Sequence, residues 1–194
     1  MGLIGQLDGV VLEDWTEIES VPLLAKYVGS GLDFGYTNDP SCLIDVYQYN
    51  REYIFDEVFY QTGLSNKAIA DLSKSFERPP IVKGDPPRIV KRSIYADSAE
   101  PKSIAEIYYH GINIYPATKG ADSIKYGLQL LQENPFRVTA RSNNVKKDLD
   151  NYLWAKDKDG NSLNVPIVIY KHSPDAMRYW AIENIGVSRK VDIR

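Results

Sequence analysis

Three strand-like segments that follow one another with only short connections constrain the fold of this chain more than any other feature. They are residues 26–33, 42–49 and 52–59, and the last two are rich in Ile, Val, Tyr and Phe. Asn50 and Arg51 separate these two segments by the length of a tight hairpin turn. Consecutive strands joined in this way form an antiparallel meander, so we expect one part of the fold to be built from neighbouring segments.

The pattern changes further along the chain, where strands and helices alternate. A first helix is expected at 65–76, and the proline-rich stretch 77–88 reads as a loop with a strand edge at Ile81–Val82. Beyond it we expect strands at 93–96, 113–116 and 136–139, helices at 103–110, 123–133, 143–154 and 174–185, and a turn at 156–161. A meander followed by βα units predicts an α/β fold, a mixed sheet with helices on both faces.

The size and composition suit one globular domain, because the chain has 194 residues and is 43% hydrophobic. We expect residues 1–24 to be an acidic, irregular lead-in segment and residues 25–194 to form the domain. Cys42 is the single cysteine, which excludes an internal disulfide and a cysteine-rich zinc site. No apolar run approaches the ~20 residues that cross a bilayer, so no membrane partner is expected. The net charge of −3 argues against a wholly basic surface but permits a local basic groove.

Three acidic residues stand where strands end or helices begin. Asp33 ends the first strand, Asp97 ends the strand at 93–96, and Asp175 lies at the start of the last helix. Each also has a structural interpretation: Asp33 and Asp97 as turn or helix-entry residues, and Asp175 as a charge at position N2, after Ser173 as N-cap. The sequence alone leaves both interpretations open.

Taken together, the three acids predict a metal site. Asp33 and Asp97 follow apolar strands, where an unpartnered charge is costly. If the two strands are neighbours, both carboxylates project from one edge of the sheet, and a helix that crosses this edge adds Asp175. Clustered carboxylates repel each other unless they share protons or bind cations, and oxygen ligands favour Mg²⁺ or Mn²⁺. Two ions ~3.5–4 Å apart would activate a water and stabilise the leaving oxygen of a phosphodiester.

His172 lies three residues before Asp175. This spacing suits a second ligand or a proton-transfer group beside the metal ions. A solvent-facing residue before a helix cap is the alternative, and the sequence does not choose between them.

Four blocks of the sequence resemble the C-terminal nuclease domain of the phage terminase large subunit. They are GLDFGYTNDP at 31–40, YADSAEPKSI at 95–104, PATKGADSI at 116–124 and HSPDAMR at 172–178. The blocks occur in the expected order within residues 25–185, and the second is the most specific. The resemblance implies an RNase H-like fold and a metal-dependent endonuclease that cuts concatemeric double-stranded phage DNA during genome packaging. It places the acidic triad of that family on Asp33, Asp97 and Asp175.

The resemblance also implies partners. Whole large terminases carry an N-terminal packaging ATPase with a P-loop, and this chain has no Gly-x-x-x-x-Gly-Lys-Ser/Thr motif. We therefore expect an excised domain that cuts DNA without translocating it. The implied partners are the ATPase domain of the same full-length polypeptide, the portal and the small terminase subunit. The implied location is the cytoplasm of an infected bacterium, at the procapsid portal.

Basic residues near the predicted strand ends are candidates for DNA contacts. Lys102 and Lys119 lie inside the family-like blocks, and Arg92 directly precedes the strand that ends at Asp97. Such residues would bind the phosphate backbone in a salt-dependent way. Two other functions stay open: an RNase H-like junction resolvase or transposase-type nuclease, and a non-catalytic module that docks on DNA or a capsid protein.

Overall fold

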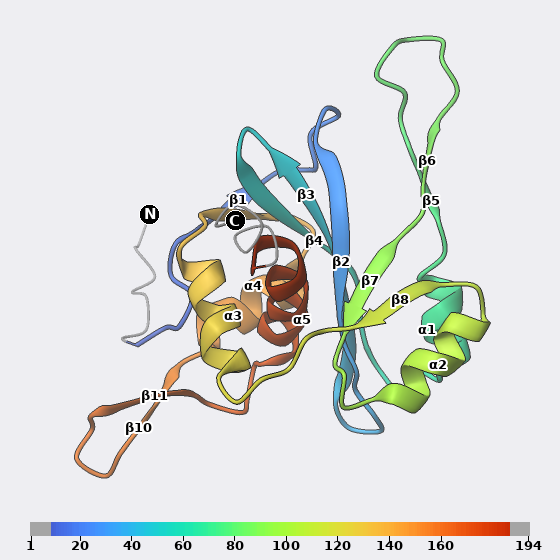
Figure 1. The fold of residues 1–194 in the computed structure, drawn as a ribbon. Helices are drawn as coiled ribbons and strands as arrows, with labels where there is room; N and C mark the ends of the chain where they lie inside the picture. The colour runs from blue at the N-terminus through green and yellow to red at the C-terminus, as the bar shows by residue number, and fades with distance from the viewer. Residues whose placement is uncertain (1–8, 187–194) are drawn as a thin grey trace, which may run out of the picture.

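A seven-stranded mixed sheet forms the centre of the computed structural model, which describes residues 9–186 (Figure 1). The strands run in the spatial order β1-β9-β4-β3-β2-β7-β8. Their bounds are β1 Trp15–Ile18, β2 Lys26–Asp33, β3 Pro40–Tyr49, β4 Glu52–Thr62, β7 Ser93–Ala96, β8 Asn113–Pro116 and β9 Phe136–Thr139. The predicted fold class, an RNase H-like mixed sheet, is confirmed.

The middle of the sheet is the predicted meander. Strands β2, β3 and β4 pair antiparallel, and Asn50 and Arg51 close the β3–β4 hairpin with left-handed φ angles of 50° and 68°. These angles match the turn that the two-residue connection predicts. The remaining strands pair in parallel: β7 with β2 and with β8 on one side, and β9 with β4 and with β1 on the other.

Helices cover both faces of the sheet, as predicted (Figure 1). One face carries α3 Ser123–Gln132, α4 Asn143–Asn151 and α5 His172–Ala181, and the last continues into a π-helical turn, Ile182–Gly186. The opposite face carries α1 Asn66–Leu72 and α2 Pro101–Tyr109. The larger core lies under α5, where Trp180 and Met177 are fully buried against β3 and β4 residues such as Phe55.

Several predicted boundaries are wrong. The helix expected at 65–76 ends at Leu72, because the Ser73 N–H closes the last turn and the chain then enters β5 Phe76–Arg78. Strand β5 pairs with β6 Arg88–Val90, so the stretch expected to be a loop is instead a hairpin that projects from the body, with Ile81–Val82 in its tip (Figure 1). Buried Arg78 secures the base of this hairpin by donating a 2.8 Å hydrogen bond to the Pro22 carbonyl.

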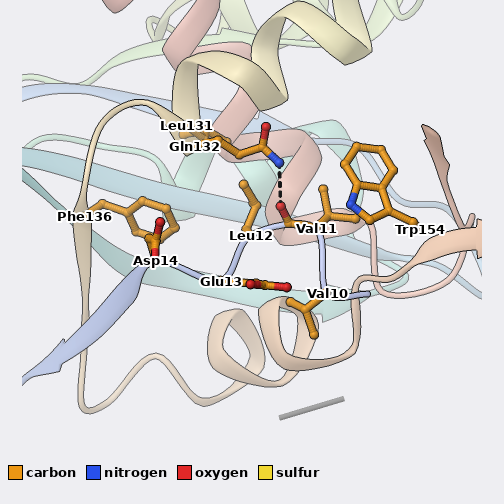
Figure 2. A pocket seen from close by; sticks show the side chains of 9 residues that line it. All are labelled: Val10, Val11, Leu12, Glu13, Asp14, Leu131, Gln132, Phe136 and Trp154. Carbon is orange, nitrogen blue, oxygen red and sulfur yellow. Dashed lines mark hydrogen bonds between the residues drawn. The ribbon is translucent and has the colours of Figure 1, made fainter. Parts of the chain in front are cut away.

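The lead-in segment is not irregular throughout. Residues 15–18 form β1, a strand that pairs with β9 at one edge of the sheet. Just before it, Val11 and Leu12 are buried, and Gln132 of α3 donates a 2.8 Å hydrogen bond to the Val11 carbonyl (Figure 2). The predicted pattern missed this contribution because the strand has only four residues. Residues 1–8 of the predicted lead-in lie outside the described part of the chain.

A second small hairpin precedes α5. It consists of β10 Trp154–Lys156 and β11 Ser162–Pro166, and the predicted turn at 156–161 connects them. No helix within residues 9–186 has the length and apolar character that a membrane span requires.

Candidate active site

Strand register brings two of the predicted acids together. Leu32 of β2 is the partner of Ala96 in the neighbouring parallel strand β7. Asp33 and Asp97 are the next residues in the two strands, so both stand at the same edge of the sheet, where the carboxyl ends of β2 and β7 meet. The condition set by the sequence, that the two strands be neighbours, is confirmed.

Helix α5 adds Asp175 because it lies in direct contact with β2 (Figure 1). Gly31 permits this contact: a Cβ atom there would stand 1.8 Å from the Ala176 carbonyl oxygen. Further along, the Trp180 indole donates a 3.1 Å hydrogen bond to the Val28 carbonyl. The helix is thereby fixed against the strand that carries Asp33.

The three carboxylates line one cleft of about 400 Å³. Its other walls come from the turn after β7, the loop between β8 and α3, and the start of α5. The lining residues that bear on its chemistry are Asp33, Asp97, Glu100, Lys119, Lys171, Asp175, Arg178 and Tyr179. The structure therefore places the predicted acids in one cleft, although they are 64 and 78 residues apart in sequence.

Each carboxylate has its own basic partner. Asp33 Oδ2 lies 2.8 Å from His172 Nδ1, and Asp97 Oδ1 forms an ion pair with the Lys119 ammonium. Asp175 Oδ1 accepts a 3.0 Å hydrogen bond from Arg178, which lies one helical turn further along α5. The cleft thus contains carboxylates and cations in alternation.

Burial and mutual repulsion mark Asp33 as a strained carboxylate. Burial raises its pKa to about 6, the His172 hydrogen bond opposes this rise, and the negative charge of Asp175 adds to it. Burial, followed by the charges of Asp175 and Asp33, also raises the pKa of the Tyr179 hydroxyl. In Asp97 the effect of burial is outweighed by Lys119 and the Ala99 N–H, which hold the pKa of this carboxyl below its ordinary value. A cation in this cleft would relieve the repulsion that Asp33 and Asp175 exert on each other.

His172 faces Asp33 and is half-buried. The hydrogen bond with Asp33 raises the pKa of the imidazole above its ordinary value, against the effect of burial. Its Nε2 lies 3.9 Å from Asp39 Oδ1. The structure thus excludes the solvent-facing alternative and makes His172 a partner of Asp33.

The start of α5 differs from the predicted cap and rests on a residue that the sequence did not point to. The helix begins at His172, with Lys171 as N-cap, so Asp175 lies a full turn inside it. Ser173 lies under the helix instead of capping it: its N–H and hydroxyl donate 3.0 and 2.8 Å hydrogen bonds to Asp148 of α4, which is buried. Asp148 also accepts a 3.3 Å hydrogen bond from the Tyr60 hydroxyl. This network fixes the end of α5 from which His172 and Asp175 project.

The cleft fits divalent cations as an open site. Within residues 9–186, no three Asp, Glu, His or Cys side chains are grouped closely enough to form a closed metal cage. Mg²⁺ commonly binds through one or two carboxylates and completes its octahedron with water and substrate phosphate oxygens. Asp33, Asp97 and Asp175 supply oxygen donors of this kind, and the buried Asp33 has the most to gain from a cation.

The predicted DNA contacts fare differently from one another. Lys119 lines the cleft, and Lys102 is exposed at the start of α2, two residues after Glu100 of the cleft wall. Arg92 does not fit the prediction, because its side chain is only 8% exposed. It forms a salt bridge of 2.9 Å with Asp45 and stacks on the Phe76 ring. Its guanidinium therefore serves the core, and Arg92 is withdrawn as a DNA contact.

Four lining residues were not predicted: Glu100, Lys171, Arg178 and Tyr179. Arg178 was within reach of sequence reasoning, because the i,i+3 spacing from Asp175 is that of a helical ion pair. Tyr179 follows it on the same helix and faces the cleft only because of how α5 is rotated over β2. No local pattern reports that rotation.

Fold and cleft together define an RNase H-like α/β domain with acidic residues at the carboxyl edge of its central strands. The model of the family described as "Terminase RNAseH like domain" matches residues 33–183, and the chain belongs to this family. The resemblance found in the sequence is thereby confirmed.

Relatives extend this assignment. The PBSX phage terminase large subunit of Bacillus subtilis (strain 168) is 24% identical over 154 residues, which make up 77% of this chain and 33% of that protein. The chain thus spans a third of its curated relative.

Solved structures share the fold. The nuclease domain of the g2p large terminase of bacteriophage SPP1, with bound Mn, superposes with a TM-score of 0.67 at 26% identity and covers 89% of this chain and 97% of that one. The P22 large terminase nuclease domain gives 0.61 at 13% identity over 94% and 95%. A large terminase from a thermophilic bacteriophage gives 0.66 at 18% identity over 91% of this chain and 45% of that one.

Proposed function

We propose that this domain is a metal-dependent endonuclease that cuts concatemeric double-stranded phage DNA during genome packaging. The observation that carries the proposal is the meeting of Asp33, Asp97 and Asp175, from β2, β7 and α5, in one cleft of a terminase RNase H-like domain. The Mn bound to the similar SPP1 nuclease domain supports the use of a divalent cation.

Two ions are proposed, Mg²⁺ or Mn²⁺, with the three aspartates as ligands. When bound, they supply activation of the attacking water and stabilisation of the leaving 3′ oxygen. The chain's own residues have separate tasks. His172 orients the Asp33 carboxylate through their 2.8 Å contact, and Arg178 does the same for Asp175. Lys102 and Lys171 stand near the cleft as cations for the DNA backbone.

Its setting is a further part of the proposal. A chain that spans 33% of a large terminase subunit supports a nuclease that works beside a packaging ATPase in one longer polypeptide. Structures of the large terminase from a thermophilic bacteriophage with ADP and with ATP-gamma-S support the presence of a nucleotide-binding module in proteins of this kind. We propose the portal and the small terminase subunit as further partners, and the procapsid portal in the bacterial cytoplasm as the place of action.

Cleavage of supercoiled plasmid tests the activity. The protein is incubated with plasmid in Mg²⁺, Mn²⁺ or EDTA, alongside the variants Asp33→Ala, Asp97→Ala and Asp175→Asn. Asp85→Asn is the matched control, because Asp85 is an exposed acid in the β5–β6 hairpin, away from the cleft. We expect cation-dependent cutting of ordinary duplex that each cleft variant abolishes and the control retains.

Other outcomes would identify a different activity. Cutting confined to branched DNA would indicate a resolvase-type nuclease. An absence of cutting with every cation, together with DNA or capsid binding that survives the three substitutions, would indicate a docking module.

A further inference from the structure

The three ion pairs of the cleft differ in how freely their basic partners can leave. Arg178 is 3% exposed, and its side chain packs against Gly127, where a Cβ atom would lie 2.1 Å from Arg178 Cγ. His172 is held between Asp33 and the edge of the Tyr60 ring. Neither side chain can move away from its carboxylate without disturbing the packing of α5.

Lys119 is different. It belongs to the connection between β8 and α3, outside any helix or strand, and its side chain is 42% exposed. Its ammonium contacts Asp97 Oδ1, the oxygen that also accepts a 2.8 Å hydrogen bond from the Ala99 N–H. A long, half-exposed side chain on a loop can exchange this contact for another at little cost.

This contact sets two cations against each other. A divalent cation on the Asp97 carboxylate would stand within a few ångströms of the ammonium, where like charges repel. The arrival of the cation therefore favours departure of the lysine, and the lysine then projects into a cleft where the next anion to enter is a DNA phosphate.

We infer that Lys119 is an exchangeable counter-ion of Asp97 that couples cation binding to DNA binding. While paired, it neutralises Asp97 and competes with the divalent cation for that carboxylate. Once displaced, it binds the DNA backbone, so that each of the two ligands promotes the binding of the other. The inference rests on the proposed nuclease function and adds to it an order: the protein binds neither ligand at full strength until both are present.

The first test measures Mn²⁺ affinity of the DNA-free protein by calorimetry, so that no cleavage is involved. Lys119→Gln should bind Mn²⁺ about three- to fivefold more tightly than the unsubstituted protein, a range that a half-exposed ion pair supports. Lys171→Gln is the matched control, because it removes the same charge from the lining of the same cleft, and its ammonium forms no ion pair within residues 9–186. An effect confined to Lys119 supports the inference. Equal effects from both substitutions, or no tightening at Lys119, would overturn it.

The second test measures DNA affinity in EDTA. Asp97→Asn should release Lys119 and tighten binding to a short duplex about threefold more than Asp175→Asn, which removes the same charge but leaves Arg178 buried. The double variant Asp97→Asn, Lys119→Gln should lose this extra gain. If Asp97→Asn and Asp175→Asn have equal effects, the coupling is refuted even when plasmid cleavage is intact. If cleavage is absent while the coupling is found, the nuclease proposal fails and the ion exchange stands.

Discussion

The contact between Gly31 and α5 gives the most severe prediction of the structure. A Cβ atom at position 31 would lie 1.8 Å from the Ala176 carbonyl oxygen and 2.6 Å from its carbon, whereas ordinary contacts begin at 3.4 Å. Gly31→Ala therefore requires β2 and α5 to separate by about 1.6 Å. Ala176 directly follows Asp175, so this separation moves Asp175 away from Asp33.

The expected cost follows from the atoms involved. Overpacking a core costs ~1–3 kcal/mol when side chains can adjust, and here the colliding group is the backbone of a buried helix. We expect a loss of about 3 kcal/mol or more, which corresponds to a Tm lower by ~6–12 °C for a chain of this size. A displacement of about 1 Å at a reacting centre lowers the rate ~100-fold, so plasmid cleavage should fall by about that factor at temperatures where the variant is folded.

Thermal unfolding followed by circular dichroism, paired with cleavage, measures both effects. Gly120→Ala is the control, because a Cβ atom there meets nothing within 4 Å and the φ angle is ordinary. It should leave the Tm nearly unchanged. A Gly31→Ala protein with the Tm and cleavage rate of the unsubstituted chain would refute the packing of α5 on β2, and with it the position of Asp175.

Two further predictions concern residues outside the cleft. Arg92→Met should lower the free energy of unfolding by about 3–5 kcal/mol in urea titrations, because it leaves Asp45 charged, buried and without its salt bridge. DNA affinity of the folded variant should be unchanged, and a selective loss of DNA binding would contradict its structural role. Asp148→Ala should cost about 1–3 kcal/mol by leaving the Ser173 N–H and hydroxyl without an acceptor. It should also slow cleavage, since α5 loses its anchor; full activity would show that this anchor does not position the helix.

The sequence predicted the parts of the fold that depend on local pattern. The turn at Asn50–Arg51 and the alternation after residue 93 each follow from short-range chemistry, and the meander and the βα units are present as expected. Failures occurred where long-range contacts decide the outcome. Strand β1 has four residues and exists because β9 offers an edge, and β5 forms because β6 returns beside it.

The candidate site shows the same division. Asp33, Asp97 and Asp175 could be singled out because acids after apolar strands and at a helix start are uncommon unless they are partnered. Arg92 was misjudged because its charge is visible in the sequence, whereas Asp45, its partner, lies 47 residues away. Asp148 was missed for a related reason: its role arises only when α4 and α5 pack together, and nothing near it in the chain indicates that contact.

Anomalous scattering from a crystal soaked in Mn²⁺ tests the central claim most directly. The account predicts that the strongest peak lies in the cleft, in contact with Asp33 and within reach of Asp97 and Asp175, and that Asp33→Asn removes it. A strongest peak on another face of the domain, or one that survives this substitution unchanged, would contradict it.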